Sequence, residues 1–220
     1  MEAGTKNFKL FHLLSEELEG YLKNLQGLFV DSLLGYRLIG KALVKEQNFL
    51  KRVLQDPEIT SEKFQNTVSF SHEQLFGEQM PTVGLFFHKK GEVKERVKNG
   101  GSNQHYIVFA VIVTLCVYWE DYFREKVAKA YRKKKIEYKH NFWGDLRLLR
   151  NTLVHKNKET ADRFRKESNT EFFREIAQKE MIILTPEIMQ RIFLLAYAFK
   201  NSLFYESLPK NTIKISNYQH

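Results

Sequence analysis

The sequence is poor in cysteine, proline and glycine. Of its 220 residues, one is cysteine, four are proline and eleven are glycine. The single cysteine, Cys116, lies in an apolar run, where we expect it to be buried, and it excludes an intrachain disulfide. Nothing therefore points to a secreted protein, and the scarcity of helix-breaking residues suits long helices. We expect a mostly helical, cytoplasmic protein.

Several motifs with well-defined chemistry are also absent. The sequence has no glycine-rich phosphate loop ending in Lys-Ser/Thr, no His-Glu-x-x-His motif and no cysteine cluster. Six scattered histidines show no metal-ligand spacing: His12, His72, His88, His105, His140 and His220. We expect neither a bound metal nor a cofactor.

No segment has the pattern of a leader or a membrane span. The first residues lead into an amphipathic pattern and not into the apolar core of a signal peptide. The most apolar run, Ile107 to Trp119, is 13 residues long and is followed directly by Glu120 and Asp121. A span needs about 20 residues. We therefore expect a buried core helix and no membrane partner.

The charge of the chain favours polyanionic partners. Its formal net charge is +9 and its pI is about 9.4, which suits RNA, DNA or an anionic membrane surface. A solvated basic face is the alternative interpretation. If RNA is the partner, the candidate phosphate-binding residues are Arg132, Lys133, Lys134, Lys135, Lys139 and Arg147.

Leucine spacing in the N-terminal segment, residues 1–56, is helical. Because Gly35 and Gly40 weaken a continuous helix, we expect two helices, near residues 6–30 and 34–55. Residues 57–103 hold most of the remaining glycines and predict an irregular or partly β insertion. Whether this insertion is a lid, an extra dimer contact or disordered stays open.

The C-terminal segment, residues 104–205, shows stronger helical patterns. We expect a central apolar helix from Gln104 to about Tyr138 and a second helix over 141–156. Thr185 as N-cap and Pro186 at the first position predict a closing helix to about Tyr205. Between these helices we expect a loop or solvated helix over 157–170 and a strand or extended piece over 181–184.

The segment Arg150-Asn151-x-x-x-His155 is the most informative motif. Asn151 and His155 are four residues apart and share one helix face, whereas Arg150 lies about 140° from His155 at about 100° per residue. The long arginine side chain can still reach that face. Three leucines with core spacing lie on another stripe of the same helix: Leu146, Leu149 and Leu153.

This trio suits cleavage of RNA by the ribose 2′-OH. A neutral histidine can accept the 2′-OH proton, and its protonated form can donate to the leaving 5′-oxygen. Arg150 can hold the phosphate and stabilise its developing charge, and Asn151 can orient the ring or the phosphate. The alternative interpretation is an ordinary surface arginine and a histidine that the helix dipole stabilises.

The apolar helix followed by Arg150-Asn151-x-x-x-His155 resembles the core of HEPN domains, whose signature is an arginine followed by a histidine, often with a polar residue after the arginine. The resemblance implies an antiparallel helical bundle, a homodimer with two facing motifs, and metal-independent endoribonuclease activity in prokaryotic defence or toxin–antitoxin systems. It also implies an acidic residue on the preceding helix, for which Glu120 and Asp121 are candidates. If that acid is buried in the bundle, it needs a partner such as Arg150.

The resemblance covers about residues 104–205, and we expect the whole chain, 1–220, to form one HEPN-like domain. It implies RNA as substrate and a second copy of the chain as partner, and it allows an antitoxin or other defence protein as a further partner. The alternatives are a non-catalytic HEPN-like interaction module and a nucleic-acid-binding regulator without cleavage.

Overall fold

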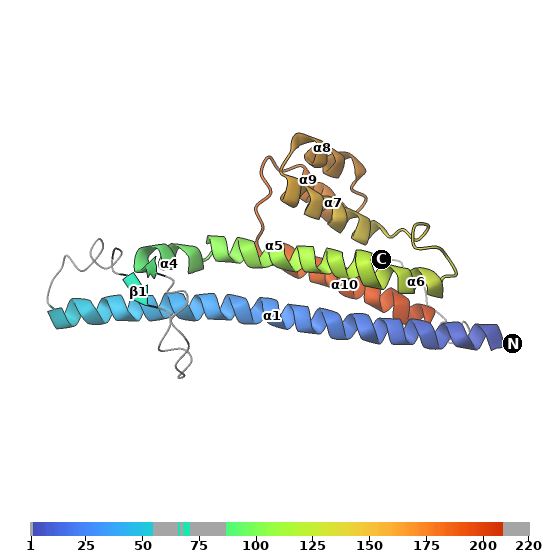
Figure 1. The fold of residues 1–220 in the computed structure, drawn as a ribbon, viewed down its shortest axis with the longest axis horizontal. Coiled ribbons are helices and arrows are strands. Elements are labelled where there is room, and N and C mark those ends of the chain that lie inside the picture. Colours follow the sequence, from blue (N-terminus) through green and yellow to red (C-terminus); the bar gives the residue numbers. More distant parts are fainter. Residues whose placement is uncertain (1, 55–65, 67, 71–86, 209–220) are drawn as a thin grey trace, which may run out of the picture. The chain divides into compact units, whose positions relative to one another are not determined.

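The computed structural model describes residues 2–54, 66, 68–70 and 87–208, and this part of the chain is mostly helical (Figure 1). A π-helical turn, η2 (Tyr118–Phe123), joins two of its helices. The α-helices are α1 (Glu2–Leu54), α4 (Lys90–Val97), α5 (Ser102–Val117), α6 (Arg124–Ala130), α7 (Asn141–His155), α8 (Lys158–Glu167), α9 (Glu171–Ala177) and α10 (Pro186–Glu206). The expected mostly helical class is confirmed.

The chain forms two compact units. One comprises Met1–Phe29 with Val108–His220, and the other comprises Val30–Ile107. The motif helix α7 and its neighbours belong to the first unit. The helical bundle considered below therefore lies in the first unit.

In the first unit the N-terminal part of α1 lies against α10 and against the α5–η2–α6 helix (Figure 1). Lys200 of α10 forms an ion pair with Glu19 of α1 at 2.5 Å. On the other side, Tyr21 stacks on Tyr118 with ring centroids 3.6 Å apart. These polar and aromatic contacts fix three long helices side by side.

The α5–η2 helix supplies much of the core, as the apolar run predicts. Its inward side chains are buried: Val108, Val111, Ile112, Leu115, Cys116, Trp119 and Phe123. Trp119 stacks in parallel on Trp143 of α7, with ring centroids 4.5 Å apart. The predicted burial of Cys116 is confirmed, since its exposed fraction is 2%.

One helical stretch among the described residues, Ser102–Ala130, is long and apolar enough to cross a membrane by length and composition alone. It is longer than the 13-residue run seen in the sequence because α5, η2 and α6 continue as one rod. Its buried face packs inside the first unit. The absence of a membrane partner stays a prediction.

Helices α7, α8 and α9 pack together through aromatic side chains. Phe173 of α9 lies 6.1 Å from Phe142 of α7 and 6.4 Å from Phe164 of α8, measured between ring centroids. Of the predicted leucine stripe, Leu146 and Leu149 are fully buried and Leu153 is half-buried. The α7 helix therefore presents the predicted face to the core.

The second unit contains the C-terminal part of α1, α4 and two short strands, β1 (Val68–Phe70) and β2 (Phe87–Lys89). The strands pair antiparallel, with Ser69 opposite His88. The predicted break between helices falls at Gly100 and Gly101. Gly100 has a φ of +73°, and a Cβ at Gly101 would collide with the backbone of Arg96. Most of the predicted insertion, residues 71–86 included, lies outside the described residues.

Four sequence predictions concern element boundaries. The structure corrects two of them, and for residues 181–184 it leaves only the extended alternative. Gly35 and Gly40 lie within one helix, α1, because each glycine costs only about 1 kcal/mol in a helix of 53 residues. The helix expected to reach residue 138 ends at Ala130. Residues 181–184 form neither helix nor strand, whereas Thr185 caps α10 by accepting a hydrogen bond from the Ile188 N–H, as predicted.

Candidate functional site

The motif occupies the last two turns of α7. His155 is the final helical residue, because Lys156 takes a left-handed conformation with φ of +49° and ends the helix. The side chain of His155 is exposed, and that of Asn151 is half-buried. The catalytic candidate His155 therefore lies on an open surface in a single copy of the chain.

Arg150 lies deeper than a surface arginine. Its side chain is half-buried, and its buried Nε has no hydrogen-bond partner among the described residues. Its guanidinium acts on the buried thiol of Cys116 in α5: burial raises the pKa of Cys116 to about 12, and the Arg150 charge opposes this rise. Arg150 is thus held against the α5–η2 helix, and part of its donor capacity is unused.

The polar side chains of α7 form one strip along the helix. Arg147, Asn151 and His155 follow at intervals of four residues, so each is turned about 40° from the one before. Arg150 lies beside these three on the α5 side, and the exposed Val154 lies between Arg150 and them. We call these five residues, Arg147, Arg150, Asn151, Val154 and His155, the motif strip.

The structure separates the two acidic candidates in η2. Asp121 is exposed, whereas Glu120 is half-buried and forms an ion pair with Arg124 at 2.9 Å. Arg124 also donates from Nε to the Tyr138 carbonyl at 3.0 Å. Glu120 is therefore the acid that faces α7, and its partner is Arg124 in place of the expected Arg150. π-helical turns occur frequently at functional sites.

The basic run Arg132–Lys135 follows α6 in a turn. Arg132 is left-handed with φ of +56°, and the Lys133 N–H bonds the Ala128 carbonyl at 2.8 Å. This Schellman ending terminates the helix before the predicted end at 138. The side chains of Arg132, Lys133 and Lys134 are exposed and that of Lys135 is half-buried, so the run is accessible to a polyanion.

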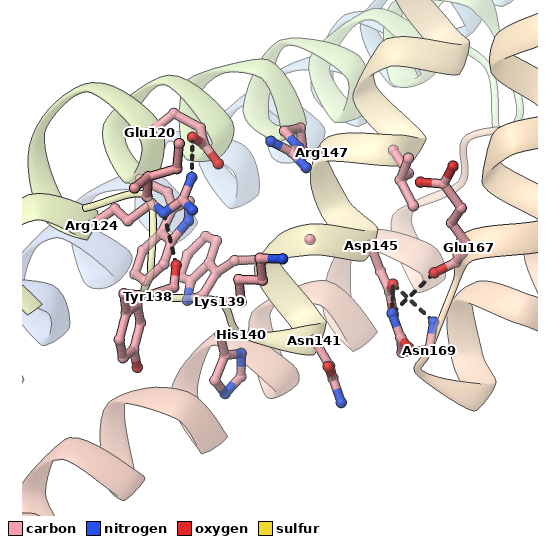
Figure 2. Close-up of a pocket in the computed structure, with 15 residues that line it drawn as sticks. Glu120, Arg124, Tyr138, Lys139, His140, Asn141, Asp145, Arg147, Glu167 and Asn169 are labelled. Carbon is pink, nitrogen blue, oxygen red and sulfur yellow. Dashed lines mark hydrogen bonds and ion pairs between the residues drawn. The ribbon is translucent and has the colours of Figure 1, made fainter. Parts of the chain in front are cut away.

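A cavity of about 600 Å³ opens at the other end of α7 (Figure 2). Of the sequence candidates, it is lined by Glu120, Lys139 and Arg147, but not by Arg150, Asn151 or His155. Its further lining residues include Trp119, Arg124, Tyr138, His140, Asn141, Trp143, Asp145, Glu167 and Asn169. The candidate residues thus fall into two groups, which lie near opposite ends of one helix and share Arg147.

Asp145 is the most buried acid of the cavity wall, with an exposed fraction of 0%. Its carboxylate accepts a hydrogen bond from the backbone N–H of Asn169 at 2.9 Å (Figure 2). It also accepts one from the backbone N–H of Thr170 at 2.7 Å. It therefore holds the start of α9 against α7. Sequence reasoning missed this role. The signal was an acid placed between two residues of the buried face, Trp143 and Leu146, since a buried acid needs hydrogen-bond partners.

Two buried nitrogens in the cavity wall are unpaired. His140 Nδ1 and Trp143 Nε1 have no hydrogen-bond partner among the described residues. Burial lowers the pKa of His140, and the nearby Asp145 charge opposes this shift. The His140 ring stands edge-on to Phe199 of α10 at 4.6 Å, measured between ring centroids. Sequence reasoning missed both residues. Their burial depends on contact with Phe199 of α10, which is far away in the sequence.

Comparisons of the chain with protein-family models, with curated proteins and with solved structures give no match. Functional assignment therefore depends on the motif strip, the cavity and their chemistry.

Proposed function

We propose that this protein is a HEPN-like, metal-independent endoribonuclease that cleaves RNA by attack of the ribose 2′-OH. The observation that carries the proposal is the placement of Arg150, Asn151 and His155 on the last two turns of α7. There the imidazole of His155 is exposed to solvent, and the guanidinium of Arg150 lies beside Cys116 of α5. The buried Nε of Arg150 has no hydrogen-bond partner among the described residues.

The chemistry follows from these three side chains. Neutral His155 accepts the 2′-OH proton as the 2′-oxygen bonds to phosphorus, and the bond from phosphorus to the 5′-oxygen breaks. The guanidinium of Arg150 stabilises the charge on the phosphoryl oxygens. Asn151, one turn before His155, orients the ring or the phosphate. The products are a 2′,3′-cyclic phosphate and a 5′-hydroxyl.

A second copy of the chain completes the site. One imidazole accepts a proton, and the leaving 5′-oxygen needs a proton from a separate acid. A homodimer in which two motif strips face each other supplies a protonated His155 as that acid. The exposed apolar residue Val154 lies within the motif strip, with an exposed fraction of 45%, and it suits an apolar contact beside the cleft.

The proposed setting is cytoplasmic defence or a toxin–antitoxin system, where RNA is the substrate and an antitoxin or other defence protein is a further partner. This setting follows from the HEPN resemblance. The basic run Arg132–Lys135 and the net charge of +9 support a polyanionic substrate.

The deciding experiment compares wild-type protein with His155→Ala on transfer and messenger RNA. We expect cleavage to fall by about 10²–10⁴-fold, the usual contribution of proton transfer by a placed side chain. Wild-type activity should persist in EDTA, yield 2′,3′-cyclic phosphate ends and stop at a 2′-deoxyribose in the cut position.

His12→Ala is the matched control, because His12 is also exposed and lies on α1 in an ion pair with Glu16. Equal cleavage by wild type, His12→Ala and His155→Ala would assign the activity to another site. Absence of cleavage in all three, with candidate activators present, would favour the non-catalytic interaction module.

Assembly gives an independent measurement. Light scattering should report a dimer for wild-type protein, and Val154→Asp should yield monomers that do not cleave RNA. Leu194→Asp is the control, since Leu194 of α10 is 68% exposed and lies on another helix. A wild-type monomer that cleaves RNA at micromolar concentration would contradict the dimeric site.

A further inference from the structure

The cavity at the N-terminus of α7 has features that the proposed catalytic motif does not use. Its wall includes four residues around the first turn of α7: His140, Asn141, Trp143 and Gly144. The backbone N–H groups at the start of a helix lack intrahelical partners. In α7 the first intrahelical hydrogen bond runs from the Gly144 N–H to the His140 carbonyl, so the N–H groups before Gly144 have no such partner. No side chain caps this end, and the first turn holds no acid. The first turn of this 15-residue helix therefore offers its free N–H groups and the positive end of the helix dipole without a side-chain cap.

An independent feature of the same wall also calls for an acceptor. Trp143 has an exposed fraction of 2%, and its Nε1 has no hydrogen-bond partner among the described residues. An indole N–H is a donor only, and a buried donor without a partner is costly. A ligand oxygen in the cavity satisfies this donor together with the helix N-terminus.

Three acids and three bases line the cavity, so its formal charge is zero, but the charged side chains left without a partner among the described residues are cations. Three acids line the cavity, but each is already compensated: Glu120 pairs with Arg124, Glu167 pairs with Arg163, and Asp145 accepts backbone N–H groups. Lys139 and Arg147 also line it, and neither has an ion pair with a described residue. The free positive charge and the free donors thus select an anion.

We propose that this cavity is a phosphate-binding subsite that holds the RNA chain at a distance from the cleavage point. This inference rests on the proposed ribonuclease function. Arg147 belongs to both the cavity wall and the motif strip, so the strip leads from the cavity to His155 along one helix. From Asn141 to His155 the helix axis rises about 21 Å at about 1.5 Å per residue. A stacked strand carries a phosphate about every 3.4 Å, so about six nucleotides bridge the two sites.

The test uses the two tryptophans of the chain, because Trp119 and Trp143 both line the cavity. Their fluorescence is followed during titration with inorganic phosphate, with a dinucleotide and with an uncleavable 2′-O-methyl octanucleotide. We expect a saturable change with each probe, and the tightest binding with the octanucleotide.

Two variants locate the site. Lys139→Gln with Arg147→Gln, and separately Trp143→Phe, should weaken phosphate binding by about tenfold or more, the usual worth of a hydrogen bond to a charged group. The matched control, Lys166→Gln with Lys179→Gln, removes the same charge from exposed positions outside the cavity and the basic run, and it should leave phosphate binding unchanged.

His155→Ala separates this inference from the proposed function, since it should abolish cleavage and bind phosphate like wild type. No fluorescence change in wild type, or an equal loss in the Lys166/Lys179 control, would overturn the subsite. Binding of the octanucleotide no tighter than the dinucleotide would overturn its assignment to RNA and indicate a small phosphorylated molecule. Loss of cleavage alone, with phosphate binding intact, would leave the subsite standing and reject the ribonuclease.

Discussion

At its N-terminal end, α7 buries Phe142, Trp143 and Asp145 against aromatic neighbours, whereas at its C-terminal end it exposes Val154 and His155. The same helix therefore offers two different environments. Low solvent access at the first end strengthens hydrogen bonds and charge interactions, which favours tight holding of a ligand. Open solvent at the second end gives an imidazole access to substrate and water, which favours proton transfer.

The two ends of α7 also differ in how much of each site one copy of the chain supplies. The cavity at the N-terminal end is lined by η2, Arg124, the segment before α7, α7 itself, and Glu167 and Asn169 at the end of α8, all from one copy of the chain. At the C-terminal end His155 is exposed, and neither it nor Arg150 nor Asn151 lines that cavity. Under the proposed function the protein binds RNA within one copy and cleaves it between two copies, and each end can be altered separately.

After His155→Ala, Arg150→Ala should produce the largest change at the C-terminal end. We expect cleavage to fall by about 10²–10³-fold, by analogy with removal of one donor to a developing oxyanion. Because Arg150 is half-buried beside Cys116, this variant also removes packing. Thermal unfolding of each variant must therefore accompany the cleavage assay.

Arg150→Lys separates packing from chemistry. Lysine keeps the charge and most of the stem but lacks the planar fork. We expect stability close to that of wild type and cleavage between those of wild type and Arg150→Ala. Full activity in Arg150→Lys would show that only charge is needed, and a normal rate in a well-folded Arg150→Ala would remove Arg150 from the site.

Reversal of charge in the run Arg132–Lys135 should have a smaller effect and should act on binding alone. Changing all four residues to Glu should weaken RNA binding for every sequence tested, because side chains that bind phosphates carry no base information. The slope of affinity against salt should fall by about one for each phosphate that the variant no longer neutralises. The control reverses the exposed Lys166 and Lys179. Equal effects in both variants would mean that only net charge matters.

Local chemistry made part of the fold predictable. Thr185 and Pro186 begin α10 and Gly100 and Gly101 separate α4 from α5, because capping, proline geometry and positive φ act within a few residues. Gly40 was misleading. It weakens a helix locally, but a Cβ placed there would lie 3.6 Å from Val97, so the residue sits at a close approach of α1 and α4 that the sequence pattern does not reveal.

The candidate site was predictable in its motif and not in its cavity. Helical spacing was enough to place Arg150, Asn151 and His155 on α7. It was not enough to choose between Glu120 and Asp121, since the π-helical turn shifts the register of the helix at those residues. The unpaired Trp143 donor depends on the packing of several segments, and no local pattern in the sequence encodes that packing.

The smallest expected effect concerns pH and tests how well the N-terminal end is enclosed. Burial lowers the pKa of His140, with Asp145 opposing and the cation of Lys139 lining the same cavity. The unfolded chain therefore binds this proton first as pH falls. The stability that neutral His140 contributes is complete above about pH 6.5 and is lost as pH falls through the lower folded pKa.

His140→Gln removes this proton uptake, so between about pH 7.5 and about pH 5 its melting temperature should fall less than that of wild type. The expected difference is below about 3 °C. His12→Gln, at an exposed position of α1, should follow wild type. If His140→Gln and wild type lose stability equally, protonated His140 is accommodated in the cavity, and the contrast between the two ends of α7 is weaker than its burial implies.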